Sequence, residues 1–308
     1  WYRLATCGNN TVETGEECDG TNLGGATCSS QGYWYGSLSC TSCSLDTLHC
    51  LDGVVAGSAD YDLTYSSVIT PAGEIIQAGY VTGISFYGNT PLGGEDCVLI
   101  KYNTDGTVAW TAQWGSSADD RALGMAQDQN GNLYVVGQTF GSIDGQPYTG
   151  SGDAFVTKFN ANGIKQWTVT YGTSTEEYAR AVVTDNNNNI YLIGITSGDL
   201  AGTGSLGGQD AFVAKVTYSG SGVFLRQFGT SGTDTALAMG IDASSNIIIT
   251  GFTTGVLGST SYGGSDLFVR KMTSSGGVTW TSQWGSSALD QGTGVAVDAG
   301  GNIYISGI

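Results

Sequence analysis

Short runs of alternating hydrophobic and polar residues, separated by turns rich in Gly, Asn, Asp and Ser, fill the chain from Leu51 onward. An alternation with a period of two residues is typical of β-strands. One run returns at Gly131–Gly137, 188–194, 245–251 and 301–307, with a divergent copy at 73–79. Its closing glycines stand at 79, 137, 194, 251 and 307, so the intervals are 58, 57, 57 and 56 residues. A fixed interval of this size predicts an array of one supersecondary unit.

One full period, from residue 120 to residue 176, contains four predicted strands. We expect them over residues 122–127, 132–136, 153–159 and 164–171. Asn-Gly turns precede the second and the fourth strand, and such turns are strong hairpin signals. Four antiparallel strands in one repeat predict one blade of a β-propeller.

The number of strands is not a multiple of four. The array begins with a strand of the fourth type near residues 54–57, continues with four complete sets, and ends at Ile308 on a first and a second strand. We therefore expect an all-β fold over residues 51–308, a β-propeller of about five four-stranded blades whose last blade lacks its third strand. A chain that continues beyond Ile308 is the alternative.

A separate module at residues 7–50 contains six of the seven cysteines: Cys7, Cys18, Cys28, Cys40, Cys43 and Cys50. A segment this short cannot bury enough apolar surface to fold unaided. An even count at this density predicts three disulfides and an oxidising compartment. Zinc bound through Cys40, Cys43 and His49 is the alternative, although a closed zinc site usually has a second cysteine pair. Cys97 corresponds to Ala154, Ala211 and Leu267 in the other repeats, which predicts a buried free thiol.

Two further features of this module are candidate sites. Its acidic residues Glu13, Glu16, Glu17 and Asp19 lie close together, and oxygen ligands on a disulfide-pinned loop suit Ca²⁺. A solvated acidic loop is the alternative. Asn9 opens the sequon Asn9-Asn10-Thr11 and is a candidate glycosylation site. We expect no required cofactor, with Ca²⁺ as the candidate ion.

The charge of the chain excludes two classes of partner. The net charge is −17, with 10 basic and 27 acidic residues. Nucleic-acid binding requires basic residues that replace phosphate counterions, and an anionic membrane surface would repel this chain. No stretch approaches the roughly 18 apolar residues of a transmembrane helix. With the cysteine-rich module, these features favour an extracellular or cell-surface location.

Acidic residues recur in two turns of the repeat, in five copies of one turn and in four copies of the other. Those between the fourth strand and the next first strand are Asp62, Asp120, Glu177, Asp234 and Asp290, and those after the first strand are Asp128, Asp185, Asp242 and Asp298. Paired carboxylates are the groups that hydrolyse glycosidic bonds. Their recurrence in every repeat favours turn hydrogen bonds instead, because catalysis seldom uses five equivalent acids. No His-based triad or phosphate loop is present, so we expect no catalytic residue and no enzyme, with a hydrolase as the last alternative.

Motifs in both parts of the chain resemble known families. Gly-Gly-x-Asp-Ala-Phe-Val-x-Lys at residues 207–215, Trp-x-x-x-x-Gly, and Gly-Asn-Ile-Tyr-x-x-Gly resemble the SBBP family of bacterial β-propeller repeats, and the hairpin at 294–304 is similar to NHL repeats. The Cys-Gly-Asn, Gly-Glu-Glu-Cys-Asp-Gly and Leu-Gly-Gly-x-Thr-Cys steps of residues 7–50 resemble myxobacterial cysteine-rich repeats. These resemblances imply multi-domain extracellular proteins without shared catalytic residues.

The incomplete blade suggests a function. Unpaired strand edges recruit strands from elsewhere, and residues 1–6 (Trp1-Tyr2-Arg3-Leu4-Ala5-Thr6) have the character of a spare strand. A strand that leaves one copy and enters the next gives a head-to-tail contact, and such contacts build filaments. We expect a non-enzymatic structural or interaction protein that assembles with copies of itself. Glycan or protein binding by the long loops is the alternative.

Overall fold

The computed structural model describes residues 9–13, 16–27, 29–31, 35–36, 38–47, 50–51, 62–83, 85–258 and 260–308. The chain divides into two compact units: Trp1–Ala56 with Asp105–Thr107, and Gly57–Thr104 with Val108–Ile308. The expected strand at residues 54–57, the segment at residues 1–6 and His49 lie outside the described residues.

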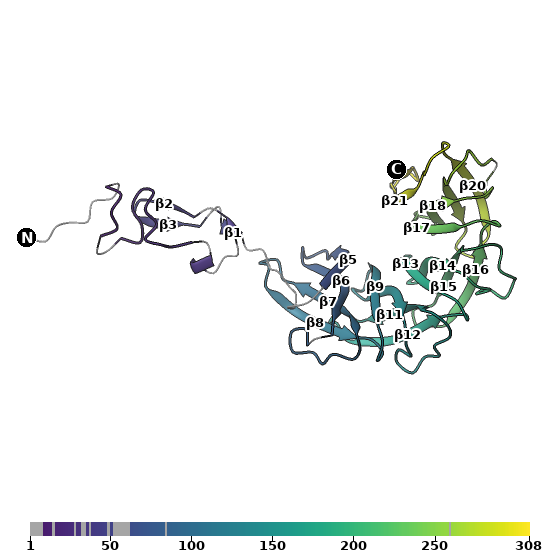
Figure 1. Ribbon diagram of the computed structural model, residues 1–308, viewed down its shortest axis with the longest axis horizontal. Helices are drawn as coiled ribbons and strands as arrows, with labels where there is room; N and C mark the ends of the chain where they lie inside the picture. The colour runs from purple at the N-terminus through teal and green to yellow at the C-terminus, as the bar shows by residue number, and fades with distance from the viewer. Residues whose placement is uncertain are drawn as a thin grey trace, which may run out of the picture. The chain divides into compact units, whose positions relative to one another are not determined.

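The smaller unit is built from short elements (Figure 1). They are the 3₁₀ helix η1 (Ser29–Gln31) and the strands β1 (Tyr35–Gly36), β2 (Ser39–Thr41), β3 (Ser44–Asp46) and β4 (Cys50–Leu51). Strand β1 pairs with β4, and β2 with β3, both antiparallel. A disulfide joins Cys18 to Cys40, and Cys43 is disulfide-bonded as well. Cys7, Cys28 and the side chain of Cys50 lie outside the described part of the chain.

The larger unit consists of four antiparallel four-stranded sheets and a final pair of strands (Figure 1). The first sheet contains β5 (Asp62–Ile69), β6 (Ile75–Thr82), β7 (Glu95–Tyr102) and β8 (Val108–Trp114). The second contains β9 (Asp120–Gln127), β10 (Leu133–Thr139), β11 (Asp153–Phe159) and β12 (Lys165–Tyr171). The third contains β13 (Glu177–Thr184), β14 (Ile190–Thr196), β15 (Asp210–Val216) and β16 (Gly222–Phe228). The fourth contains β17 (Asp234–Ile241), β18 (Ile247–Thr253), β19 (Asp266–Met272) and β20 (Val278–Trp284), and the final pair is β21 (Gly292–Val297) with β22 (Ile303–Gly307).

The strand order within each sheet follows the chain, as the repeat predicts. The first strands β5, β9, β13, β17 and β21 lie next to one another in that order. Four complete sets followed by a first and a second strand confirm the predicted fold. Strand ends shift by a few residues: β10 spans Leu133–Thr139, and the side chain of Asn132, just before it, is bonded to the turn residue Asp128.

Hydrophobic side chains fill the space between consecutive sheets. The cluster between the first two sheets includes Leu99, Trp114, Val135 and Phe155, and equivalent clusters lie between the second and third and between the third and fourth sheets. The aromatic residue that ends a fourth strand packs on the third strand of the next sheet, as Trp114 does on Phe159 at 4.7 Å between ring centroids. Large rings at matched positions therefore join neighbouring blades.

The closing position of each repeat must be a glycine because the first strand packs closely against it, which the sequence did not reveal. In every repeat the first strand carries a β-bulge where it passes this glycine, for example between Ala122 and Gly124 beside Gly137. The bulge brings a backbone carbonyl so close that a Cβ on the glycine would lie 1.8 to 2.0 Å from it, as with Arg121 O and Gly137. No other residue fits without moving the backbone.

Candidate functional site

The acids between the fourth and the next first strand hold turns together. Asp120, Glu177 and Asp234 are fully buried. Each accepts hydrogen bonds from the backbone N–H and the hydroxyl of the residue four positions earlier: Ser116, Thr173, Thr230 and, for Asp290, Ser286. One hydroxyl residue thus serves one acid in each of these four repeats, and the residue four positions before Asp62 lies outside the described part of the chain. This pattern supports the structural interpretation of these four acids, and one buried oxygen of Asp120 and of Asp234 is left without a hydrogen-bond partner.

The acids that open the third strands are also structural. Asp96, Asp153, Asp210 and Asp266 each accept a backbone N–H from the preceding loop, at 2.8 to 3.1 Å. One buried oxygen of Asp153, Asp210 and Asp266 has no hydrogen-bond partner. Burial raises the pKa of Asp153 to about 6, against a hydrogen bond from Thr149 N that lowers it. Burial likewise raises the pKa of Asp120.

A second set of acids organises the turn between the first and second strands. Asp128 accepts bonds from the backbone and side chain of Asn132 and, at 3.0 Å, from the hydroxyl of Tyr134. The same acid–asparagine bonds recur at Asp185, Asp242 and Asp298, and the tyrosine bond recurs at Asp185 and Asp298. The acid and the asparagine recur in these turns because one carboxylate accepts hydrogen bonds from several backbone and side-chain donors.

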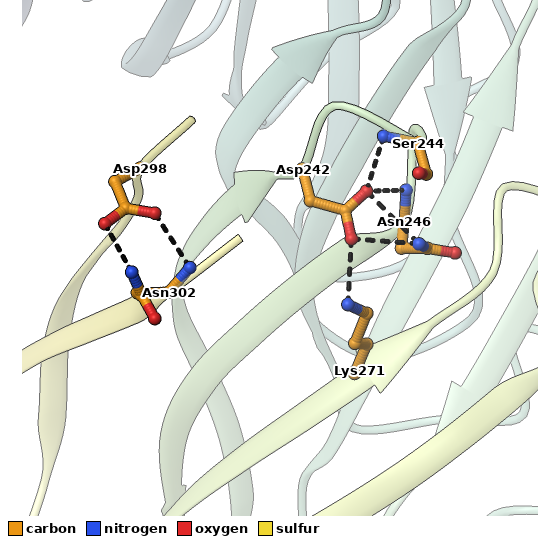
Figure 2. Close-up of polar contacts among 6 residues, drawn as sticks. All are labelled: Asp242, Ser244, Asn246, Lys271, Asp298 and Asn302. Carbon is orange, nitrogen blue, oxygen red and sulfur yellow. Dashed lines mark hydrogen bonds and ion pairs between the residues drawn. The ribbon is translucent and has the colours of Figure 1, made fainter. Parts of the chain in front are cut away.

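The third strand adds a lysine to this turn. Lys271 of β19 donates to Asp242 Oδ2 at 2.8 Å (Figure 2). Burial alone would raise the pKa of Asp242, but the bonds from Lys271 and Asn246 outweigh it and lower that pKa to about 2. Lys101 pairs with Glu74 in the same way, at 2.7 Å.

The fifth repeat has the turn without the lysine. Asp298 is bonded to Asn302 as in the other repeats, and within residues 260–308 and the rest of the described chain no lysine or arginine pairs with it (Figure 2). The reason is that β22 has a strand, β21, on one side only among the described residues. Strands β6, β10, β14 and β18, its counterparts, have strands on both sides.

The same edge exposes apolar side chains that are covered elsewhere. Tyr304 is 58% exposed, whereas its counterparts Tyr134 and Tyr191 are fully buried. Trp284 is 52% exposed, whereas its counterpart Trp114 is 2% exposed. We call Trp284, Asp298, Ile303, Tyr304 and Ile305 the open edge. It is the candidate functional site, because exposed aromatic residues beside a strand edge that has no neighbour among the described residues are typical of an interaction surface.

A hollow beside the first strands is the other candidate. It is lined by Tyr65, Ser66, Met125, Arg180 and Leu237, among others, and no acidic residue lines it. Tyr65, Arg180 and Leu237 are the bulged residues of their strands and therefore point away from the ladder. Arg180 is the charged residue among those that line the hollow, and Tyr65 is the other residue there that can take part in proton transfer.

The residues proposed for calcium do not converge on one point. Asp19 Oδ2 accepts the backbone N–H of Asn9 and of Thr11, Glu16 Oε2 that of Glu13, and Glu17 Oε2 that of Leu45. Among the residues that the structure describes, no group of three or more His, Cys, Asp or Glu could hold a metal ion. Calcium binding here stays a prediction. Asn9, the glycosylation candidate, is exposed, and its Oδ1 accepts Thr11 N.

Comparison with known proteins gives distant matches. No family model matches the chain, so the resemblances to SBBP, NHL and cysteine-rich repeats are not confirmed. The regulatory protein FlaEY of Caulobacter vibrioides is 29% identical over 184 residues, 54% of this chain and 19% of that protein. An uncharacterized WD repeat-containing protein of Acanthamoeba polyphaga mimivirus is 28% identical over 171 residues, 46% of this chain and 12% of that protein. The chain spans less than one fifth of the length of either relative.

Solved structures with a similar arrangement carry the names of enzymes. A gluconolactonase from Xanthomonas campestris has a TM-score of 0.41 at 13% identity, covering 81% of this chain and 82% of its own. A puromycin hydrolase has a TM-score of 0.46 at 12% identity, covering 82% of this chain and 37% of its own. The expectation that the chain is not an enzyme is therefore corrected, because proteins similar in fold are named as enzymes and the fold gives no ground for excluding activity.

No helix in the described part of the chain is both long and apolar enough to cross a membrane.

Proposed function

We propose that this protein is an extracellular subunit that assembles head to tail, with residues 1–6 of one copy adding as a third strand to β22 of the next. The observation that carries the proposal is the exposure of Tyr304 at a position that is fully buried in the second, third and fourth repeats. An added strand would pair the free side of β22 and cover this ring. Addition of a strand to an open sheet edge is a common mode of protein association.

The burial pattern of the sheets supports an added strand. All seven residues of β10 and of β14 are buried, because each strand has a neighbour on both sides and a sheet on both faces. In β22 three of five residues are exposed and none is buried. A free β-strand edge leaves N–H and C=O groups without partners, and covering it gains both hydrogen bonds and apolar burial.

The composition of residues 1–6 fits the role of donor. Trp1, Arg3 and Ala5 alternate with Tyr2, Leu4 and Thr6, which gives a strand with large apolar side chains and one cation. A copy of the same chain as donor produces a heterologous contact, which generates a filament unless the rotation closes a ring. The Cys18–Cys40 disulfide supports an oxidising extracellular setting.

The experiment removes the donor strand. We expect the full chain to form polymers in negative-stain images, and the chain lacking residues 1–6 to remain monomeric. Addition of a peptide of sequence WYRLAT should then occupy the open edge and protect β22 amides from hydrogen exchange, whereas the reversed peptide TALRYW should not. Polymers formed by the shortened chain would contradict the proposal, since residues following Ile308 or another segment would then fill the edge.

A further inference from the structure

The third strand places a lysine at one fixed position beside the second strand in every complete repeat. Lys101, Lys158, Lys215 and Lys271 are the Cα partners of Ile76, Tyr134, Tyr191 and Ile248. The equivalent residue of β22 is Tyr304. A third strand that completes the fifth repeat in the same register therefore places one residue opposite Tyr304.

The surroundings of this position favour a cation in two ways. Where the second strand has a tyrosine, the lysine lies near its ring, with Lys158 Nζ 5.7 Å from the Tyr134 centroid and Lys215 Nζ 4.9 Å from the Tyr191 centroid. Both lysines also donate to a backbone carbonyl of the next sheet, Tyr218 O and Ser274 O, and Lys158 Nζ lies 2.9 Å from the Tyr218 centroid. Where it has an isoleucine, the lysine pairs directly with the acid of the turn, as Lys271 does with Asp242. Cations are attracted to the face of an aromatic ring and to a carboxylate.

The fifth repeat offers both attractions at once. The Tyr304 ring is exposed, and its hydroxyl donates to Asp298 Oδ2 at 3.1 Å. A hydrogen bond from Asn302 lowers the pKa of Asp298, so this carboxylate is charged at neutral pH. The open edge thus presents a negative charge and an aromatic face at the place that four other repeats fill with a lysine. Figure 2 shows Asp298 without a lysine and Asp242 with Lys271.

We infer that Arg3 of the neighbouring copy occupies this place, over the Tyr304 ring and beside Asp298, so that it fixes the register of the donated strand. This inference rests on the proposed function. Arg3 is the one basic residue of the segment 1–6. A guanidinium stacks on aromatic rings and pairs with carboxylates, so it can replace the ammonium of the other repeats.

The same register also brings a second residue of the donated segment to an exposed apolar side chain. If Arg3 lies opposite Tyr304, Leu4 lies opposite Ile303, at the position that Phe159 holds opposite Leu133. Phe159 packs on Trp114, whose counterpart Trp284 is the exposed ring of the open edge. Leu4 would therefore cover Trp284, and one register satisfies both the charge and the apolar contact.

Charge variants of the full chain test the cation. We expect Arg3→Glu to raise the critical concentration of assembly by about tenfold or more, and Arg3→Lys to leave it within about threefold. Arg226→Glu, the same substitution at an exposed residue of β16, is the control and should assemble like the wild type. Equal assembly of the Arg3→Glu and wild-type proteins would overturn the inference.

Cysteine pairs test the register. The full chain with Leu4→Cys and Ile303→Cys should give disulfide-linked ladders on a non-reducing gel, because directly opposite residues bring their Cβ atoms close. Leu4→Cys with Ile305→Cys is shifted by two residues and should give few links. The reverse result overturns the register while strand donation stands. Assembly of the chain that lacks residues 1–6 instead overturns the proposed function itself.

Discussion

Tyr191 and Tyr304 occupy the same position in the second strand of their repeats, yet Tyr191 is fully buried and Tyr304 is 58% exposed. Both hydroxyls donate to the acid of the preceding turn, Asp185 and Asp298, at 3.1 Å. Only Tyr191 has a third strand beside it, whose Lys215 lies over the ring. The difference therefore arises from the neighbouring strand and not from the local sequence.

The closing glycines should tolerate no side chain. A Cβ at Gly137 would lie 1.9 Å from Arg121 O, so Gly137→Ala must displace the bulge of β9 and should lower the free energy of unfolding by about 2–3 kcal/mol or more. Gly222→Ala is the control, because a Cβ there meets nothing within 4 Å, and it should change stability by about 0.5 kcal/mol or less. Urea denaturation followed by tryptophan fluorescence measures both. Equal effects would contradict the bulge explanation.

The turn acids should differ in their contribution to stability. Asp242→Ala removes the ion pair with Lys271 and the turn bonds to Ser244 and Asn246, so we expect a loss of about 2–4 kcal/mol. Asp298→Ala removes similar turn bonds from an exposed site without a lysine, so the loss should be smaller in the monomer. Denaturation of the two variants on the background lacking residues 1–6 compares them. A larger loss for Asp298→Ala would be inconsistent with the geometry.

The stability of the propeller should depend on pH through Asp153. Burial raises the pKa of this carboxyl to about 6 from 3.8, so between these values the folded state binds more protons than the unfolded state. Stability from this group is present below pH 4 and is lost as the pH rises toward 6. Asp153→Asn should reduce this decline by up to about 1.4 kcal/mol per pH unit within that window. Measurement of the free energy of unfolding from pH 4 to pH 7 checks this prediction. An equal dependence of that free energy on pH in the Asp153→Asn and wild-type proteins would refute it.

Cys97 should be inert in the native protein. It is the free cysteine of the described residues and is fully buried, and burial raises the pKa of its thiol well above the usual range. Iodoacetamide reacts with thiolates, so it should label no thiol in the native, non-reduced chain and one thiol in denaturant. Intact-mass measurement counts the adducts. More than one adduct in denaturant would contradict three disulfides within residues 7–50.

The sequence determined the repeat and most of the strands. Its period, its Asn-Gly turns and its alternating residues predicted four complete sets and a final pair, because local turn chemistry and the strand period are written in neighbouring residues. It also predicted that the recurring acids are structural. The hydrogen bond from Thr230 to Asp234 is an example, because a hydroxyl residue and an acid four positions later recur together in the sequence.

Only the tertiary structure decided the packing contacts between neighbouring strands and sheets. The closeness of Arg121 O to Gly137 depends on a bulge in the adjacent strand, and the cover over Trp114 comes from Phe159 of the next sheet. The exposure of Trp284 and Tyr304 likewise depends on which strand is beside them, 20 or more residues away in the other repeats, as Tyr191 and Lys215 show. Contacts of this kind arise from packing, and a linear pattern carries no direct record of them.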